Sequence, residues 1–235
     1  MQNALIWGWL DESPDIKDLF YREVVEEDCY QRFFKVEEGD IVVDIGASVG
    51  IFPYKLSERN PKVVYCIEPD PKSCLAIKQN AEYLTFPVHL FTGAISKYDN
   101  NVKLNTLINS DTLSFPNILE RDNLTEVQGI TFRSFCEVYN ILKINFLKVD
   151  CEGGEYDIFT ESNLEWIVSN VNKVAGEWHL YTGELKRSFH TFTSLYLNKT
   201  QSYKILTMNN EDITDKVFDY GFINRYEALQ IYLEF

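Results

Sequence analysis

The stretch VVDIGASVGIF, residues 42–52, joins an apolar segment rich in Val and Ile to a glycine turn. Such a segment favours a buried β-strand, and Gly46 and Gly50 stand where that strand would end. Glycine lets a backbone approach a ligand closely, and the helix that would follow offers free N–H groups. The stretch therefore predicts a strand, a turn and a helix start, as in nucleotide-cofactor sites. The alternative is a tight turn without a ligand.

Short apolar segments alternate with helical patterns on both sides of this stretch, which is typical of parallel βαβ units. Strands are expected over residues 41–46, 62–68, 144–150 and 172–180, a third strand with its exit over 87–96, and helices over 72–84, 132–142 and 184–198. Two last strands, 202–208 and 227–235, are expected to form an antiparallel pair on a mostly parallel sheet.

The chain has 235 residues, a length that suits one larger domain better than two. We expect an N-terminal segment over residues 1–38 that packs on a domain over residues 39–235. Residues 97–128 interrupt the alternation, because they are polar and rich in Asn and Asp. We interpret them as an insertion that covers a cleft as a lid.

The net charge and the spacing of the cysteines limit the binding partners and the cellular location that are expected for this chain. Lys and Arg number 22 and Asp and Glu 36, so the formal net charge is −14. This charge repels a phosphate backbone and an anionic membrane, so neither nucleic acid nor membrane is expected as a partner. The five cysteines form no C-x-x-C pair, which argues against a disulfide framework and a zinc site and favours a cytoplasmic location. The N-terminus is typical of neither a secretory signal nor a membrane span.

Glu68 ends the second expected strand, 18 residues after Gly50. An acid at this place can accept hydrogen bonds from both ribose hydroxyls of an adenosine, which NAD and S-adenosylmethionine share. The alternative is a solvated acid at a strand end. The spacing Gly46-x-x-x-Gly50 differs from the G-x-G-x-x-G of dinucleotide sites. Asp44 suits the cationic amino-acid part of S-adenosylmethionine, so this cofactor is favoured.

Four blocks of sequence resemble one known family. They are DIGASVG (44–50), IEPDP (67–71), GAIS (93–96) and FLKVDCEGGEYDIF (146–159). In this order they resemble the FkbM-family methyltransferases, whose hallmark run Lys-x-Asp-x-Glu-Gly-x-Glu reads here Lys148, Asp150, Glu152, Gly153 and Glu155. The resemblance implies an α/β Rossmann-like class I methyltransferase fold, with a mostly parallel seven-stranded sheet, one antiparallel strand and helices on both faces. It also implies methyl transfer from S-adenosyl-L-methionine, usually to a hydroxyl of a sugar or secondary metabolite, with S-adenosyl-L-homocysteine as product.

The resemblance also implies roles for individual residues at the cofactor. The methionine part would be wrapped by Asp44, Gly46, Ala47, Ser48 and Gly50, the ribose held by Glu68, and the adenine bordered by Pro69, Ala94 and Ile95. Ser48 departs from the family, which usually has Asn there. The residues after 185 lie outside the resemblance, and we expect them to shape the acceptor pocket.

The acids after the fourth expected strand are the first catalytic candidates. An alcohol is nearly as hard to deprotonate as water, with a pKa of ~15.7, so its methylation needs a base or a cation. Alternation puts Lys148 and Asp150 on one face, and Asp150 lies where open α/β sheets bind ligands. The alternatives are a turn cap for Asp150 and a buried ion pair for Lys148. Glu152 would reach the cleft, whereas Glu155 and Asp157 are expected mainly to stabilise a helix N-terminus.

The fifth expected strand carries the second group of candidates. Glu177 and His179 share one face of it, and its end would meet Asp150, because the fourth and fifth strands of this fold are neighbours. His179 is the first choice as general base. A divalent metal held by two carboxylates and the imidazole ranks second, because no standard metal motif is present. A structural, hydrogen-bonded histidine is the third alternative.

The leading hypothesis is thus an O-methyltransferase acting on a small molecule, sugar or glycan. An RNA 2′-O-methyltransferase shares the Lys/Asp pairing, but the net charge weighs against it. A nicotinamide-dependent oxidoreductase would need the missing dinucleotide fingerprint. A cofactor-binding pseudo-enzyme with a scaffold role would tolerate the loss of Asp150 and His179, yet both are present.

Overall fold

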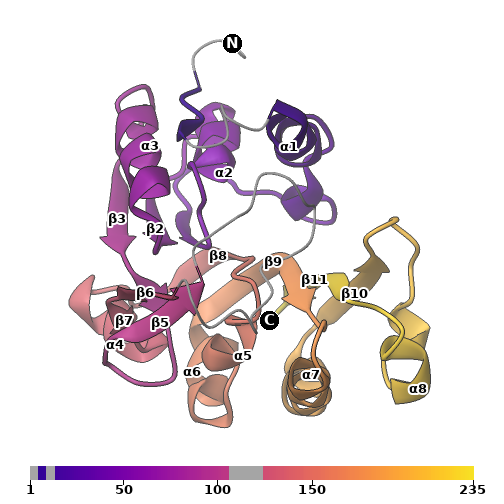
Figure 1. The fold of residues 1–235 in the computed structure, drawn as a ribbon. Helices are drawn as coiled ribbons and strands as arrows, with labels where there is room; N and C mark the ends of the chain where they lie inside the picture. The colour runs from indigo at the N-terminus through magenta and orange to yellow at the C-terminus, as the bar shows by residue number, and fades with distance from the viewer. Residues whose placement is uncertain (1–4, 9–13, 106–123) are drawn as a thin grey trace.

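The computed structural model describes residues 5–8, 14–105 and 124–235, and its centre is a seven-stranded sheet (Figure 1). The strand order is β10-β11-β9-β8-β1-β2-β3. The strands are β1 (Ile41–Ile45), β2 (Val63–Glu68), β3 (Val88–Thr92), β8 (Ile144–Val149), β9 (Val171–His179), β10 (Ser202–Thr207) and β11 (Ala228–Glu234).

Strand directions confirm the expected class of sheet. β1 pairs in parallel with β2 and β8, β2 with β3, and β8 with β9. β11 runs antiparallel to both β9 and β10, so it is the one antiparallel strand, and the expected pairing of the last two strands is confirmed. The carboxyl ends of β1, β2, β8 and β9 therefore meet at one edge of the sheet.

Helices cover both faces of the sheet, as Figure 1 shows, and each face has its own apolar core. Strand β1 contributes side chains to both cores, since Val43 and Ile45 pack into one cluster and Val42 packs into the other. The first cluster includes residues of α4 (Phe132–Val138), α6 (Leu164–Asn170) and α7 (Gly183–Tyr196). The second includes residues of α2 (Ile51–Lys55) and α3 (Pro71–Ala81).

The N-terminal residues form short helical pieces against the second cluster. They are α1 (Pro14–Phe20), a π-helical turn (Tyr21–Glu26) and a 3₁₀ turn (Cys29–Gln31). The Tyr232 hydroxyl of β11 donates a hydrogen bond to the Cys29 carbonyl oxygen at 2.6 Å, and Lys55 Nζ donates to the Val25 carbonyl oxygen at 2.7 Å. These bonds hold the segment beside the carboxyl edge of the sheet.

The third strand and its exit, expected over residues 87–96, are observed as two separate elements. β3 ends at Thr92, and the chain then leaves the sheet as β4 (Ala94–Ile95), which pairs with β7 (Gly129–Ile130) in a separate small sheet. Gly93 makes this exit, because a Cβ atom there would lie 2.4 Å from the Gln128 carbonyl oxygen. The close approach of two backbones accounts for the break.

Two helices end earlier than expected. The helix expected over 72–84 begins with Asp70, which caps it by accepting a hydrogen bond from Ser73 N at 2.7 Å, but it ends at Ala81. The helix expected over 132–142 ends at Val138, since Asn140 has a left-handed φ of 52°. The helix expected over 184–198 is observed as α7.

The arms of the expected insertion form a two-stranded antiparallel ribbon, β5 (Val102–Asn105) with β6 (Leu124–Val127). The segment between them, 106–123, lies outside the described residues, so the lid stays a prediction. All five cysteines are free thiols. No helix in the described ranges is long and apolar enough to cross a membrane.

Candidate active site

The glycine turn after β1 lies directly against the residues that follow β8. The Asp150 backbone N–H donates to the Ile45 carbonyl oxygen at 3.0 Å. A Cβ atom on Gly46, whose φ is 77°, would lie only 1.8 Å from the Asp150 carbonyl oxygen. Gly50, with a φ of 80°, opens α2. The predicted cofactor turn and the acidic stretch are therefore neighbours, although about a hundred residues separate them in sequence.

Glu68 closes β2 beside this turn and is 7% exposed. Its Oε2 accepts a hydrogen bond from Ser48 N and its Oε1 from Asp70 N, both at 2.8 Å. Burial raises the pKa of Glu68 to about 7, although these two bonds act in the opposite direction. Each carboxylate oxygen has a second lone pair. The carboxylate therefore fits a ribose diol, with one hydroxyl donating to each oxygen.

The other residues predicted to contact the cofactor differ from one another in backbone conformation and in burial. Ser48 has a left-handed φ of 49°, a conformation in which Asn is more often found than Ser. Pro69 and Ala94 are partly exposed near Glu68, whose carbonyl oxygen accepts a hydrogen bond from Gly93 N at 3.0 Å. Ala47 and Ile95 are buried, and the Ile95 side chain belongs to an apolar core cluster.

Asp44 and Lys148 form a buried ion pair beneath the turn. Lys148 Nζ lies 3.1 Å from Asp44 Oδ1 and donates a 2.6 Å hydrogen bond to the Gly46 carbonyl oxygen. Burial raises the pKa of Asp44, and the charge of Lys148 opposes this rise. The sequence left Lys148 as either a catalytic candidate or part of a buried ion pair, and this geometry agrees with the buried ion pair. Both side chains thus support the turn from inside the fold.

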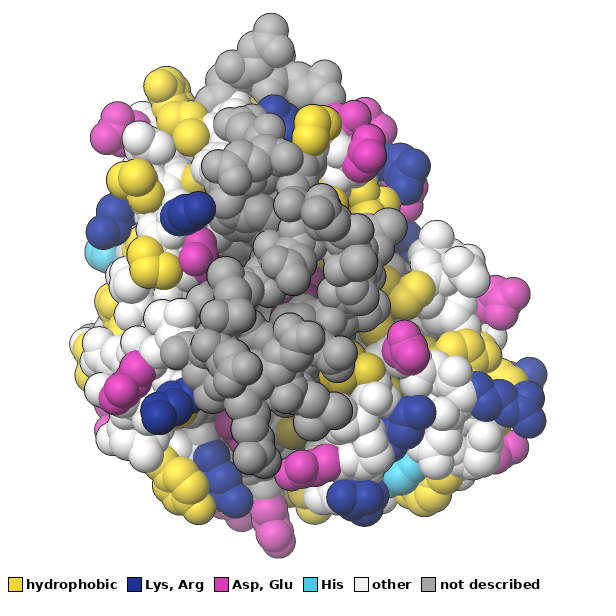
Figure 2. Space-filling model, in the orientation of Figure 1, with side chains coloured by type: hydrophobic (Ala, Val, Ile, Leu, Met, Phe, Trp, Pro, Cys, Tyr) yellow, Lys and Arg dark blue, Asp and Glu magenta, His cyan; other side chains and the backbone are white. Residues whose placement is uncertain are grey.

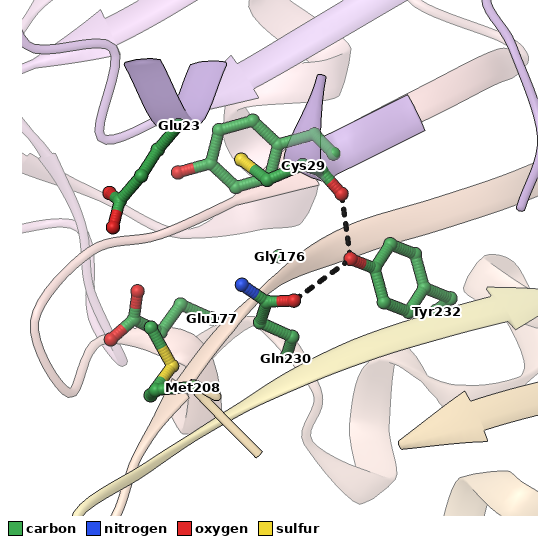
Figure 3. Close-up of a pocket in the computed structure, with 8 residues that line it drawn as sticks. Glu23, Cys29, Gly176, Glu177, Met208, Gln230 and Tyr232 are labelled. Atoms are coloured by element: carbon green, nitrogen blue, oxygen red, sulfur yellow. Dashed lines mark hydrogen bonds between the residues drawn. The ribbon is translucent and has the colours of Figure 1, made fainter. Parts of the chain in front are cut away.

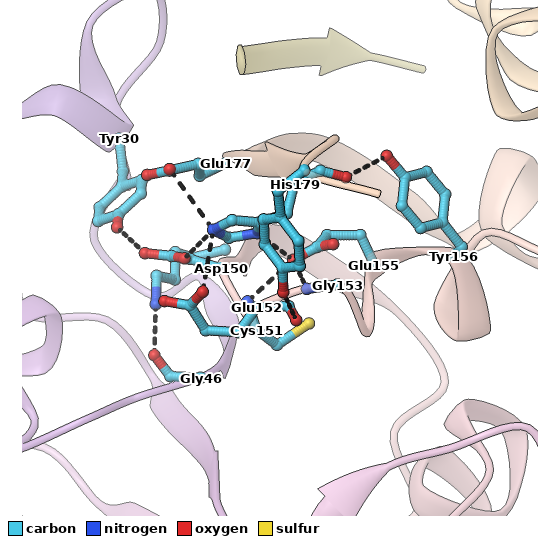
Figure 4. Close-up of polar contacts among 12 residues, drawn as sticks. Tyr30, Gly46, Asp150, Cys151, Glu152, Gly153, Glu155, Tyr156, Glu177 and His179 are labelled. Atoms are coloured by element: carbon cyan, nitrogen blue, oxygen red, sulfur yellow. Dashed lines mark hydrogen bonds and ion pairs between the residues drawn. The ribbon is translucent and has the colours of Figure 1, made fainter. Parts of the chain in front are cut away.

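His179, the last residue of β9, lies among four carboxylates (Figure 4). Its ring is 1% exposed. Nδ1 lies 2.9 Å from Glu155 Oε1, and Nε2 lies 3.5 Å from Glu152 Oε2, 3.5 Å from Glu177 Oε1 and 4.0 Å from Asp150 Oδ1. The structure thus brings together Asp150, Glu177 and His179, as the strand order predicts.

Glu155 has a role that the sequence did not reveal. It opens α5 (Glu155–Ile158), is fully buried, and accepts hydrogen bonds from Cys151 N at 3.1 Å and Gly153 N at 3.2 Å. These backbone bonds agree with the expected role at a helix start. The same Oε1 also meets His179 Nδ1. In the tautomer with a proton on Nδ1, His179 donates this bond, and Nε2 faces the other acids.

Burial and crowding shift the pKa values of these groups. Burial alone would lower the pKa of His179, but the charge and hydrogen bond of Glu155, followed by the charges of Glu152 and Glu177, raise it to about 10. Burial raises the pKa of Glu177 to about 8, with Asp150 adding to the effect. Burial also raises the pKa of Glu152 to about 7. An imidazole that already holds a proton at neutral pH is a poor general base.

Tyr30 is a further residue that sequence reasoning missed. It comes from the N-terminal 3₁₀ turn and donates a 2.7 Å hydrogen bond to Asp150 Oδ2. Its ring also lies beneath Lys148 Nζ, which is 5.2 Å from the ring centroid. No signal in the chain links positions 30 and 150, so only the fold reveals the contact. The other carboxylate oxygen of Asp150, Oδ1, lies 4.0 Å from His179 Nε2.

A pocket lies beside Glu177, between the N-terminal segment and the last strands of the sheet (Figure 3). It is lined by Glu23, Cys29, Tyr30, Gly176, Glu177, Met208, Gln230 and Tyr232. Three of these, Met208, Gln230 and Tyr232, come from the part of the chain after residue 185. The pocket thus opens next to the acids around His179.

Comparisons with known proteins identify relatives of this chain. The family model described as Methyltransferase FkbM domain matches residues 44–222. The protein 31-O-demethyl-FK506 methyltransferase FkbM of Streptomyces tacrolimicus is 36% identical over 63 residues, which are 26% of this chain and 24% of that protein.

Two solved structures are similar to this chain, and the first of them supports the fold. The structure of methyltransferase FkbM from Methylobacillus flagellatus KT shares 15% identity and a TM-score of 0.51, over 86% of this chain and 45% of that one. An rRNA methylase from Streptococcus thermophilus has 12% identity and a TM-score of 0.49, over 85% of this chain and 88% of that one. The chain thus spans less than half the length of the two FkbM relatives.

Proposed function

The chain belongs to the FkbM methyltransferase family, and from this premise we propose that it methylates a hydroxyl of a small molecule, sugar or glycan. Family membership makes it an S-adenosylmethionine-dependent methyltransferase. The acceptor and the residue roles are the proposal. The observation that carries it is the contact between Gly46 and Asp150, since this contact sets the acids around His179 beside the cofactor turn.

The residues at the turn fit S-adenosylmethionine, which supplies an electrophilic methyl group on a sulfonium and leaves as S-adenosylhomocysteine. The Glu68 carboxylate accepts hydrogen bonds from the ribose hydroxyls. The glycine turn, braced by Asp44 and Lys148, admits the methionine part. Carboxylates at this edge surround the sulfonium with negative charge, which favours a cation.

Glu177 is the residue we assign to take the acceptor proton; it acts in its ionised form, whose share grows as pH rises through its pKa of about 8, below the pKa of about 10 of His179. It lies 3.5 Å from His179 Nε2 and also lines the pocket (Figure 3), a cavity of about 20 Å³ that has room for a hydroxyl group and not for a whole acceptor. A Glu177 oxygen would take the hydroxyl proton of the acceptor while S-adenosylmethionine, held by the turn and Glu68, would supply the methyl group. Asp150 Oδ1 orients that hydroxyl, because Tyr30 holds the other oxygen.

His179 is not assigned the role of base that the sequence favoured. Its Nδ1 is bonded to Glu155, and the carboxylates around the ring hold a proton on the imidazole. It acts as a positioning residue at the centre of the cluster.

Two observations support a small or glycan acceptor rather than RNA. The name of the Streptomyces relative contains the small molecule 31-O-demethyl-FK506 and no nucleic acid. The net charge here is −14, and on the face shown in Figure 2 the Lys and Arg side chains of the described residues are dispersed among acids and apolar groups. Affinity for a phosphate backbone depends on clustered positive charge.

The acceptor class is tested with methyl-labelled S-adenosylmethionine and a panel of hydroxylated metabolites, sugars and glycans, with total RNA in parallel. We expect label in an alkali-stable methyl ether of one panel member. Label in RNA alone would show that RNA, and not a small molecule or glycan, is the acceptor. Label in neither fraction, from a folded enzyme that binds S-adenosylhomocysteine, would contradict the hydroxyl-acceptor proposal for the panel chosen.

Replacing Glu68 by Gln is expected to weaken S-adenosylhomocysteine binding at least about tenfold. Hydrogen bonds to a charged group contribute about 1.5–3 kcal/mol, which is about 10- to 150-fold in affinity. Isothermal titration calorimetry measures the change, with thermal unfolding as a check on folding. Glu58→Gln, at an exposed acid, is the matched control. Equal affinity of wild type and Glu68→Gln would remove Glu68 from the cofactor site.

The raised pKa of Glu68 predicts a pH dependence of stability. Its pKa is about 7 in the fold against an ordinary value of 4.5, so the folded state binds the proton more tightly than the unfolded state. The resulting stabilisation is present below pH 4.5 and is lost as pH rises through 7; from the pKa difference it amounts to at most about 3 kcal/mol.

Urea unfolding of wild type and Glu68→Gln between pH 5 and pH 8 measures this effect. The free energy of unfolding of wild type should fall with pH relative to the variant. S-adenosylhomocysteine affinity of wild type should rise over the same range, because the ionised carboxylate is the better acceptor. Parallel stability curves would show that the Glu68 pKa is not raised.

A further inference from the structure

We propose that Asp150, Glu152 and His179 bind a divalent transition-metal ion at the carboxyl edge of the sheet. The binding itself does not depend on the acceptor, whereas the use of the ion in catalysis rests on the proposed function. One ligand atom from each of the three residues lies within 4.8 Å of the other two. The three side chains come from the ends of two neighbouring strands, β8 and β9.

The distances suit ligands of a shared ion better than direct hydrogen bonds. His179 Nε2 is 3.5 Å from Glu152 Oε2 and 4.0 Å from Asp150 Oδ1. Good hydrogen bonds between nitrogen and oxygen are about 2.7–3.2 Å long. Metal–ligand bonds of about 2.1 Å place two ligands about 3.4 Å apart when the ion is tetrahedral. They place two ligands about 4.2 Å apart when these lie on opposite sides of the ion. An ion fits between these atoms with small side-chain shifts.

The orientation of His179 is a separate observation that points to a metal. The ring is almost fully buried, and its Nδ1 is bonded to the fully buried Glu155, whose Oε1 also accepts from Cys151 N and Gly153 N (Figure 4). Metal-ligating histidines almost always donate their other N–H to such a carboxylate, which fixes the ring and the tautomer. Here the arrangement turns Nε2 toward Asp150 and Glu152, and a bound ion would take the place of the Nε2 proton that these carboxylates otherwise hold.

The charge balance also favours a cation at this place. Glu152, Glu177 and Asp150 face one imidazole nitrogen. Lys148, the ammonium group that the structure places nearest the turn, is already paired with Asp44 and bonded to the Gly46 carbonyl oxygen. Like charges this close repel each other, and a divalent ion among them converts the repulsion into attraction.

The ligand types select a class of metal. One imidazole nitrogen with two carboxylate oxygens suits Mn²⁺, Fe²⁺ or Zn²⁺ better than Mg²⁺ or Ca²⁺, which prefer oxygen alone. Three protein ligands leave a position open, as in catalytic sites. An acceptor hydroxyl at that position would have its pKa lowered by the ion, which eases transfer of its proton to Glu177. The sequence ranked a metal second because ligands from two strand ends form no contiguous motif.

The test is a titration of the full-length chain with MnCl₂, without cofactor or acceptor, followed by electron paramagnetic resonance and calorimetry. We expect one bound Mn²⁺ per chain, with ¹⁴N coupling from the His179 imidazole in the pulsed spectrum. Glu152→Gln and Asp150→Asn should each weaken binding at least about tenfold. Glu161→Gln, at an exposed acid outside the cluster, is the matched control and should bind as wild type does.

Three results would overturn the site. They are no uptake of Mn²⁺ or Zn²⁺ in the millimolar range, equal uptake by wild type and both cluster variants, and uptake without nitrogen coupling, which means adventitious binding to surface carboxylates. Glu152 is half-exposed, so its variant is expected to fold. Because no acceptor is present, failure here leaves the proposed function standing, and an inactive chain that binds Mn²⁺ would instead contradict that function.

Discussion

Glu177→Gln is expected to lower kcat by about 10²- to 10⁴-fold, the contribution typical of a general base. The amide keeps the shape of the side chain but cannot take the acceptor proton. Glu177 is the acid that both meets His179 Nε2 and lines the pocket, so no other carboxylate in the described structure shares its position. S-adenosylhomocysteine affinity should stay within about threefold of wild type, because the ribose is held by Glu68.

Single-turnover methyl transfer measures this effect apart from product release. Glu161→Gln is the control for a general change in negative charge, and its kcat should equal that of wild type. A Glu177→Gln enzyme with wild-type kcat would assign the proton to another group. A parallel loss of cofactor affinity would mean that Glu177 supports the cofactor site instead.

Gly46→Ala should abolish cofactor binding and destabilise the fold by about 2–5 kcal/mol. A left-handed φ costs a non-glycine residue about 1–2 kcal/mol, and overpacking costs about 1–3 kcal/mol more. Both apply here, since Gly46 has a φ of 77° and its new Cβ would meet the Asp150 carbonyl oxygen at 1.8 Å. That oxygen belongs to the backbone, so only a shift of the turn or of the residues after β8 relieves the clash.

Gly39→Ala separates the two effects. Gly39 has a φ of 83°, but a Cβ atom there meets nothing within 4 Å. The free energy of unfolding of this control variant should fall only by the cost of the left-handed conformation, about 1–2 kcal/mol. The variant should bind S-adenosylhomocysteine as wild type does. Urea unfolding and calorimetry measure both variants. If Gly46→Ala costs no more than Gly39→Ala, the turn and Asp150 are not in the contact described.

Local patterns were sufficient to predict most of the sheet. Val and Ile runs bounded by turn residues predicted the strands around residues 41–45 and 144–149, and the fold class predicted that the fourth and fifth strands are neighbours. The exit of the third strand was expected within residues 87–96, but its position after Thr92 could not be predicted, because it depends on Gly93 passing close to Gln128. A contact between residues 35 positions apart leaves no periodic signal in either segment.

The candidate site was predictable where its residues end strands. Asp150, Glu177 and His179 could be expected together from strand order and alternation alone. Tyr30 and the bond from Glu155 to His179 could not, since both depend on tertiary contacts that local propensity does not encode. Glu155 shows the limit clearly, because an acid in the first turn of a helix is usually explained by the helix dipole.

The most direct test of the account is a crystal structure of the chain with S-adenosylhomocysteine. We expect the ribose hydroxyls within about 2.6–3.2 Å of the Glu68 carboxylate oxygens, the amino-acid part against the turn at Gly46, and the sulfur on the side of Asp150 and Glu177. A ligand bound elsewhere, or one whose sulfur faces away from these acids, would contradict the claim that this edge of the sheet is the methyl-transfer site.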